Sequence, residues 1–365
     1  MTQPSQPKPT LPPDREPPPE SLVIDGEYRF GTYDGPIGEI NPLDVADGSG
    51  AGGQLRRTAR NLRLKEWEAF QLGDDDWFVL GAVYDTKSIA LLQVLGVHKE
   101  TGTIHRWETK VPSSSLSVAR GLSGTRSHGR RGDFSISIGN EMGAGRLTID
   151  ASHPGRRSFD PLPALELHGV GDCAAGRAGH LVICHPFPSD RDDRALYSHK
   201  AMMPFAGTMR IGPEVVELSA DRAFMILDDH HGDYPRPMQY DWVTGVRRAE
   251  DGRVEGFNLT DNQIRDPQVY NENAVWLGDA VHRLPPVHVE RPKGPMGTWF
   301  VRDESGAVDV RFEPTVRSEM HVGPRRALAE YHAPYGWFEG RIHTEQVDLR
   351  VDGIFGVGEQ KLIRV

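Results

Sequence analysis

The densest group of ionisable side chains in the sequence is Asp228-Asp229-His230-His231-Gly232-Asp233-Tyr234-Pro235-Arg236. Carboxyl and imidazole groups are the side chains that most often move protons in general acid–base catalysis. We therefore take Asp228, Asp229, His230 and His231 as the candidate catalytic residues.

The apolar run Ala223–Leu227 precedes this group and predicts a strand that delivers it to the mouth of a cavity. Because successive side chains of a strand point to opposite faces, Asp228 and His230 would face one side, and Asp229 and His231 the other. Only one of the two pairs can face a cavity. The alternative is a polar turn with exposed histidines. We predict no metal site, since adjacent histidines point apart in an extended chain.

Aromatic residues follow this group, and three of them, Tyr240, Trp242 and Trp276, stand beside polar side chains. A carboxyl group buried next to such rings would have a raised pKa, and the ring faces could stabilise a developing cation. The alternative is that these rings are ordinary core residues. We include all three among the candidate substrate-binding residues.

Three further candidates for substrate binding are polar. Asn271 and Glu272 belong to a compact set of donors and acceptors, Asn271-Glu272-Asn273. His199 is followed by Lys200 at the expected start of a strand, where the two could orient a carbonyl or carboxylate of a ligand. The alternative for His199 and Lys200 is a solvated strand edge.

The elements expected around these residues are short strands. The chain has 28 Pro and 40 Gly, and polar and apolar residues alternate in segments such as Phe134–Ile138, Val308–Phe312 and Val347–Asp352. Segments with helical periodicity are few, and Ser318–Tyr331 is the one short helix that we expect, interrupted by Gly and Pro. The pattern predicts a mainly β protein built from antiparallel barrels or sandwiches.

At 365 residues the chain is longer than one core usually fills, so we expect two domains. Residues 1–57, rich in Pro and Gly, are assigned to a partly disordered N-terminal extension. Residues 58–190 are assigned to a first β-barrel domain and residues 191–365 to a second. The boundary is placed at the charged stretch Asp190–Arg194.

Several classes of function lack their motifs. The sequence has no phosphate-binding loop, dinucleotide fingerprint, nucleophile elbow or His-Glu-x-x-His helix, and we expect no cofactor. The net charge of −10 disfavours nucleic acid and anionic membranes as partners. Two cysteines cannot form a disulfide framework, and no secretory signal or long apolar run is present, which predicts a cytoplasmic protein without stable membrane insertion.

Several short strings follow one another in a fixed order along the chain. They are Tyr197-x-His199-Lys200, Pro204-Phe205-Ala206-Gly207, Asp228-Asp229-His230-His231-Gly232-x-Tyr234-Pro235, Trp242, Gly256-Phe257-Asn258-Leu259-Thr260, Asn271-Glu272-Asn273-Ala274-x-Trp276, Leu284-Pro285-Pro286-Val287, Tyr335-Gly336-x-Phe338-x-Gly340 and Gly353-x-x-Gly356-x-x-Glu359. Together they resemble the DUF2804 family of uncharacterised proteins. The resemblance covers roughly residues 58 to 365.

At greater distance the chain is similar to the tandem lipocalin-like group of carotenoid hydratases and tocopherol cyclases. That resemblance implies two antiparallel lipocalin-like β-barrels packed together, with few short helices, around an apolar cavity. It also implies an aspartic acid that protonates a carbon–carbon double bond, namely Asp228 or Asp229. His230 or His231 would be its partner, with Tyr240 and Trp242 as aromatic neighbours.

Three functions remain open at this stage. The first is an enzyme, a hydro-lyase or an isomerase or cyclase without a redox cofactor, acting on an isoprenoid, steroid or fatty-acyl substrate in a β-barrel cavity. The second is a non-catalytic lipid carrier or sensor that uses the same cavity. A scaffold acting through its surface is the third. We expect a hydrophobic small molecule as the partner, and a homodimer is left open.

Overall fold

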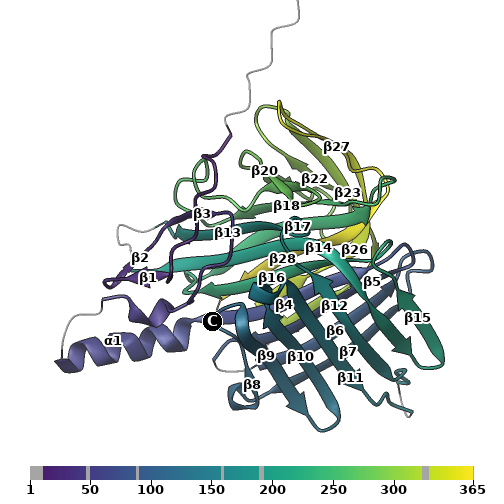
Figure 1. Cartoon of the computed structure of the whole chain (residues 1–365), viewed down its shortest axis with the longest axis horizontal. Coiled ribbons are helices and arrows are strands. Elements are labelled where there is room, and N and C mark those ends of the chain that lie inside the picture. Colours follow the sequence, from purple (N-terminus) through teal and green to yellow (C-terminus); the bar gives the residue numbers. More distant parts are fainter. Residues whose placement is uncertain are drawn as a thin grey trace, which may run out of the picture.

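The structure, a computed structural model, describes residues 11–46, 50–87, 90–157, 160–188, 193–322 and 329–364. Within these ranges the chain is mainly β, and it folds into two curled antiparallel sheets, one a nearly closed barrel and the other a half-barrel. The described residues contain one α-helix, α1 (Gly50–Arg63), which extends from the lower left of the molecule in Figure 1. The predicted fold class is confirmed.

The first sheet has 14 strands in the described chain. Its main path runs β7 (Ile104–Val111), β6 (Ala90–His98), β5 (Trp77–Asp85), β4 (Lys65–Gly73), β16 (Phe224–Gly232), β14 (Ala195–Ile211), β12 (Leu165–Asp172), β11 (Arg146–His153), β10 (Phe134–Glu141), β9 (Ser123–Arg131) and β8 (Leu116–Ser117). Three strands branch from this path: β13 (Gly179–Pro186), β3 (Gly31–Tyr33) and β15 (Glu214–Leu218).

The second sheet has 12 described strands and follows the first in sequence. Its main path runs β20 (Ala280–Arg283), β19 (Ala274–Leu277), β18 (Val254–Asn262), β17 (Met238–Arg248), β28 (Ile354–Ile363), β26 (Tyr335–His343), β23 (Val308–Val316), β22 (Trp299–Arg302) and β21 (His288–Glu290). β24 (Glu319–Val322), β25 (Ala329–His332) and β27 (Asp348–Arg350) lie off it. In Figure 1 its strands β18, β20, β22, β23 and β27 lie above the blue strands β4 to β7 and β9 to β11 of the first sheet.

Apolar side chains fill three layers. One layer fills the inside of the first barrel, with Phe70, Val94 and Ile138 among its buried residues. A second layer lies between the two sheets and includes Phe78 from the first and Phe355 from the second. The third lies within the half-barrel. The alternating segments of the sequence explain these layers, because one side of each strand, such as the Phe134, Ile136 and Ile138 side of β10, is buried.

Part of the segment assigned to the N-terminal extension belongs to the folded body. β1 (Val23–Ile24), β2 (Glu27–Tyr28), β3 and a 3₁₀ turn (Pro42–Asp44) surround a buried cluster that they share with β13 and β14. Two more 3₁₀ turns, Ser113–Ser115 and Met142–Ala144, lie in the first sheet's connections. Residues 1–10 lie outside the described residues.

The helix expected within residues 318–331 is wrong. Residues 319–322 and 329–332 form strands β24 and β25, which pair with each other, and β25 also pairs with β28. This pairing depends on distant parts of the chain and overrides the weak helical pattern.

The sheets change between β16 and β17, so β14 and β16 still belong to the first sheet. The boundary predicted at residues 190 and 191 lies outside the described residues, and the division into two folding units stays a prediction. In the described part of the chain, no helix has both the length and the apolar character needed to cross a membrane.

Candidate functional site

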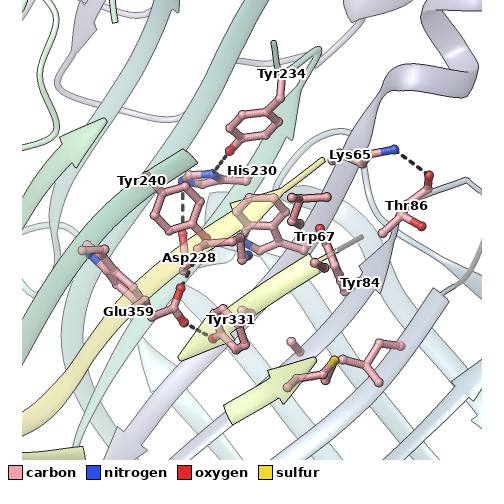
Figure 2. A pocket seen from close by; sticks show the side chains of 18 of the residues that line it. Lys65, Trp67, Tyr84, Thr86, Asp228, His230, Tyr234, Tyr240, Tyr331 and Glu359 are labelled. Carbon is pink, nitrogen blue, oxygen red and sulfur yellow. Dashed lines mark hydrogen bonds and ion pairs between the residues drawn. The ribbon is translucent and has the colours of Figure 1, made fainter. Parts of the chain in front are cut away.

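A cavity of about 580 Å³ lies between the two sheets (Figure 2). Strands β4, β5, β14 and β16 of the first sheet form one wall, and β17, β18, β25 and β28 of the second form the other. Apolar side chains such as Ala69, Leu80, Ala82, Leu196 and Ile363 line much of it. The prediction that the cavity lies inside a β-barrel is wrong for the first barrel, because its inside is packed with core side chains; the cavity lies between the two sheets.

Strand β16 places the candidate catalytic residues on two different faces. Asp228 and His230 line the cavity, while Asp229 and His231 are buried on the opposite face. This division follows from strand alternation, as the sequence predicted. The alternative of a polar turn with exposed histidines is wrong, since all four side chains are buried within a strand.

The cavity wall carries a charged cluster formed by cross-strand neighbours. Lys200 lies opposite Asp228 in the β14–β16 register, and its Nζ donates to Asp228 Oδ1 at 2.6 Å. The same Nζ is 3.8 Å from Glu272 Oε2. Although burial opposes ionisation, Lys200 lowers the pKa of Asp228, and the two carboxylates in turn raise the pKa of Lys200. Asp228 is therefore held ionised, contrary to the raised pKa expected for a catalytic acid.

His230 is the centre of a chain of hydrogen bonds that ends at Glu272. Ser198 Oγ lies 2.6 Å from His230 Nε2 and donates to Glu272 Oε2 at 2.6 Å. On the other side of the ring, His230 Nδ1 is 3.2 Å from the Tyr234 hydroxyl, as Figure 2 shows. The indole of Trp67 stacks on the imidazole with centroids 4.4 Å apart. These contacts fix the ring and connect the hydroxyl groups of Ser198 and Tyr234, the imidazole of His230 and the carboxylate of Glu272.

Opposite this cluster, β28 brings a second carboxyl group into the cavity. Glu359 accepts a hydrogen bond from Tyr240 at 3.2 Å and another from Tyr331, both visible in Figure 2. Burial raises the pKa of Glu359, and Asp228 adds to this effect, against the opposing influence of Lys361 and the two hydroxyl groups. Glu359, rather than Asp228, is the carboxyl group of the cavity whose surroundings favour the protonated form.

On the other face of β16, the barrel interior holds a separate polar network. His231 bridges Glu66 at 3.0 Å and Asp229 at 3.1 Å, and this raises the pKa of His231 to about 9 although burial opposes the charge. Glu68 lies opposite Asp229 in the β4–β16 register. Burial and the charge of Asp229 raise the pKa of Glu68 to about 8.

Of the other predicted substrate-binding residues, some line the cavity and some do not. Tyr240, Trp242 and Glu272 line the cavity. His199 does not: it is fully buried beside His180, with their ring nitrogens 3.1 Å apart.

Asn271 and Trp276 have structural contacts outside the cavity lining. Asn271 Oδ1 accepts from the backbone N–H of Asn273 at 2.9 Å, and Trp276 Nε1 donates to the carbonyl of Gly179 at 2.8 Å. Among the described residues, no group of three or more His, Cys, Asp or Glu side chains is arranged to hold a metal ion.

The polar residues that line the cavity without having been predicted from the sequence include Lys200, Tyr331, Glu359 and Lys361. In the sequence, Lys200 stands out only beside His199, and Glu359 only as part of a string that resembles the family. The pair Glu359 and Lys361 has the period-2 spacing of one strand face, but a charged pair of that kind is more often solvated.

Comparison with known proteins gives one family match. The model of the family described as "Domain of unknown function (DUF2804)" matches residues 17–364. A search of curated protein sequences finds no match.

Solved structures with a similar arrangement have low sequence identity. A protein from Nitrosomonas europaea, provisionally described as an AttH, is 12% identical over 84% of this chain and 94% of that one, with a TM-score of 0.46. Kievitone hydratase from Nectria haematococca is 13% identical over 82% and 88%, with a TM-score of 0.44. CghA with Sch210972 is 11% identical over 83% and 88%, with a TM-score of 0.37.

Proposed function

The chain belongs to the DUF2804 family, which carries no assigned activity, and we propose from its cavity that it binds a hydrophobic small molecule and performs acid–base chemistry on it. The substrate class is an isoprenoid, steroid or fatty-acyl compound, and the reaction is a hydration, dehydration or isomerisation without a redox cofactor. A cavity of about 580 Å³ suits a single ligand of this kind.

The observation that carries this proposal is that two carboxyl groups of one cavity have pKa values shifted in opposite directions. Burial raises the pKa of Glu359, while Lys200 lowers the pKa of Asp228. Pairs of titratable groups with pKa values driven apart are typical of acid–base sites. Glu359 is the proton donor in this proposal, and Asp228 is the fixed negative charge.

Protonation of a double bond, or loss of a protonated hydroxyl group, creates positive charge on the substrate. The cluster opposite Glu359 contains two carboxylates, Asp228 and Glu272, and one ammonium group, Lys200, so these three carry a net charge of −1. A negative cluster stabilises such a cation in a site from which bulk water is excluded. His230, held by Ser198 and Tyr234, is placed to bind or release the water molecule of a hydration.

Two measurements test the proposal. Native mass spectrometry of the protein from its own host, followed by extraction, identifies the bound molecule. Turnover of that molecule is then compared between the wild type and Glu359→Gln. We expect Glu359→Gln to retain binding but to lose about 100-fold or more in rate, the usual contribution of a general acid.

Glu68→Gln is the matched control, because Glu68 is also a buried carboxyl group of raised pKa but lies inside the barrel. It should turn the substrate over at the wild-type rate. Binding with no turnover in any variant, the wild type included, would leave a lipid carrier as the function. A protein that takes up no hydrophobic molecule would overturn the proposal entirely.

A further inference from the structure

Lys361 lines the cavity and is surrounded by aromatic rings. Its strand, β28, pairs with β17 and β25, and this register places Tyr240 on one side of Lys361 and Tyr331 on the other. The ammonium nitrogen lies 5.0 Å from each of these ring centroids. It also lies 5.1 Å from the ring of Trp67 and 5.5 Å from that of Tyr84, which both belong to the first sheet. Rings from both sheets thus form a cage around one amino group.

This amino group has no hydrogen-bond or ion-pair partner among the described residues. Lys200, in the same cavity, differs because its Nζ contacts Asp228 at 2.6 Å. Burial lowers the pKa of Lys361, only partly offset by Glu359, whereas the pKa of Lys200 is raised. Of these two cavity lysines, Lys361 is therefore the one more readily available as a neutral amine, the form that attacks carbonyl carbon.

We propose that the ε-amine of Lys361 forms an imine with an apolar aldehyde or ketone bound in the cavity. This rests on the proposed function, since it uses the same cavity and the same acid, and it names a carbonyl compound as the substrate class. The nitrogen bonds to the carbonyl carbon and transfers one of its two protons to the carbonyl oxygen, which gives a carbinolamine. A second proton, donated to the hydroxyl group, lets the C–O bond break and water leave, and the nitrogen then gives up its remaining proton.

Glu359 is positioned to serve the two proton transfers that accompany the loss of water. It lies two residues before Lys361 on β28, hence on the same face of the strand, and both residues line the cavity. Its protonated form donates to the departing hydroxyl group, and its carboxylate accepts the proton that the amine releases, so the acid is regenerated. The four rings around Nζ also suit a protonated imine, a cation with little capacity for hydrogen bonding.

The test uses the full chain with decanal as the probe and cyanoborohydride to reduce any imine to a stable amine. We expect one decyl group per chain, found on Lys361 by peptide mapping and blocked by excess decanol. Lys361→Arg should reduce this labelling at least tenfold while decanol still binds, as measured by native mass spectrometry. Glu359→Gln should slow the labelling without weakening decanol binding.

Lys99→Arg is the matched control. Lys99 is also buried near two aromatic rings and has a lowered pKa, but it donates to the carbonyl of Asp74 and does not line the cavity. This variant should label like the wild type. Labelling at Lys65 or Lys110 with Lys361 unmodified would overturn the imine proposal, as would binding of decanol without any adduct. Failure of decanol itself to bind would instead overturn the proposed function.

Discussion

The hydrogen bonds from Tyr240 and Tyr331 to Glu359 influence the pH at which this residue loses its proton. Both donate to its carboxylate and so favour the ionised form. Removing one donor in Tyr240→Phe should therefore raise the pKa of Glu359, by about one unit for a hydrogen bond to a charged group. An activity that needs protonated Glu359 falls as the pH passes this pKa, so the falling limb of the pH–rate profile should move to higher pH.

Tyr335→Phe serves as the control for this shift, because the buried Tyr335 hydroxyl group makes no hydrogen bond to Glu359 among the described residues. Its profile should coincide with that of the wild type. A Tyr240→Phe profile that moved to lower pH would contradict the assignment of Glu359 as the acid.

Glu68 makes stability depend on pH in a direction that can be stated. Its pKa is raised from 4.5 to about 8 in the folded protein, so the fold keeps a proton there that the unfolded chain has released. The stabilisation is complete below pH 4.5 and is lost as the pH rises through about 8. In Glu68→Gln, which is always neutral, the melting temperature should fall less between about pH 5 and pH 8.

The buried carboxyl oxygen atoms of Glu68 and Asp229 support the prediction of a proton held at Glu68. One oxygen each of Glu68 and Asp229 has no hydrogen-bond partner in the described part of the molecule, and the two residues lie directly opposite in register. A proton shared between them would satisfy both. Glu217→Gln, on the exposed strand β15, should keep the wild-type pH dependence, and an equal change in both variants would exclude Glu68 as its source.

Strand β16 places two polar networks on opposite faces by its alternation, and each network can be disrupted alone. In Asp229→Asn, the charged His231 loses one of its two carboxylate partners inside the barrel, which should cost about 3 kcal/mol of unfolding free energy. In Asp228→Asn, Lys200 keeps Glu272 as a second carboxylate at 3.8 Å, so the loss of stability should be smaller and the change in ligand turnover larger. Chemical denaturation and turnover of both variants test this opposite pattern. A larger loss of stability in Asp228→Asn and a larger loss of turnover in Asp229→Asn would contradict this assignment of the two faces.

This strand also shows how much the sequence could predict. Alternation within one strand separates Asp228 and His230 from Asp229 and His231, and this separation could be predicted from local spacing alone. The residues that β28 contributes to the site could not be predicted from local spacing. Glu359 and Lys361 reach the cavity only because β28 pairs with β17, with Trp242 opposite Glu359 and Tyr240 opposite Lys361. Such a register joins residues more than 100 positions apart and leaves no local signal.

The same limit applies to the fold. The strands of the body were predictable because segments such as Val347–Asp352 alternate, and there Val347, Leu349 and Val351 are buried. The location of the cavity could not be predicted, because it depends on how the outside of the first barrel faces the second sheet. The folded part of the N-terminal segment was hidden by its proline content, although Tyr28 and Ile40 are buried in a cluster with Tyr197.

At the scale of the whole molecule, the cavity owes its volume partly to two small residues. Ala69 and Ala82 are paired across β4 and β5 on its wall, and Ala69 lies opposite Asp228. Replacing Ala69 by Leu should fill part of the space, raise the free energy of unfolding by about 1 kcal/mol and weaken ligand binding at least tenfold. Calorimetry and ligand titration measure the two effects.

Ala280→Leu, at an exposed position of β20, should change neither quantity. Undiminished ligand binding by Ala69→Leu would mean that the ligand occupies some other part of the protein. The same geometry predicts that a bound ligand contacts both sheets and stabilises the whole fold, by about 2.7 kcal/mol at a concentration 100 times its Kd.

The order of the two sheets along the chain has a consequence for synthesis on the ribosome. All strands of the first sheet have been made once Gly232 is added, so the barrel can close while the second sheet is still absent. The cavity is completed much later, because Glu359 and Lys361 are carried by β28, the last strand of the second sheet in sequence. A nascent chain thus contains every described strand of the barrel long before it contains all strands that line the cavity. If the proposed function holds, a hydrophobic molecule is captured only after β28 has been made and has joined the second sheet.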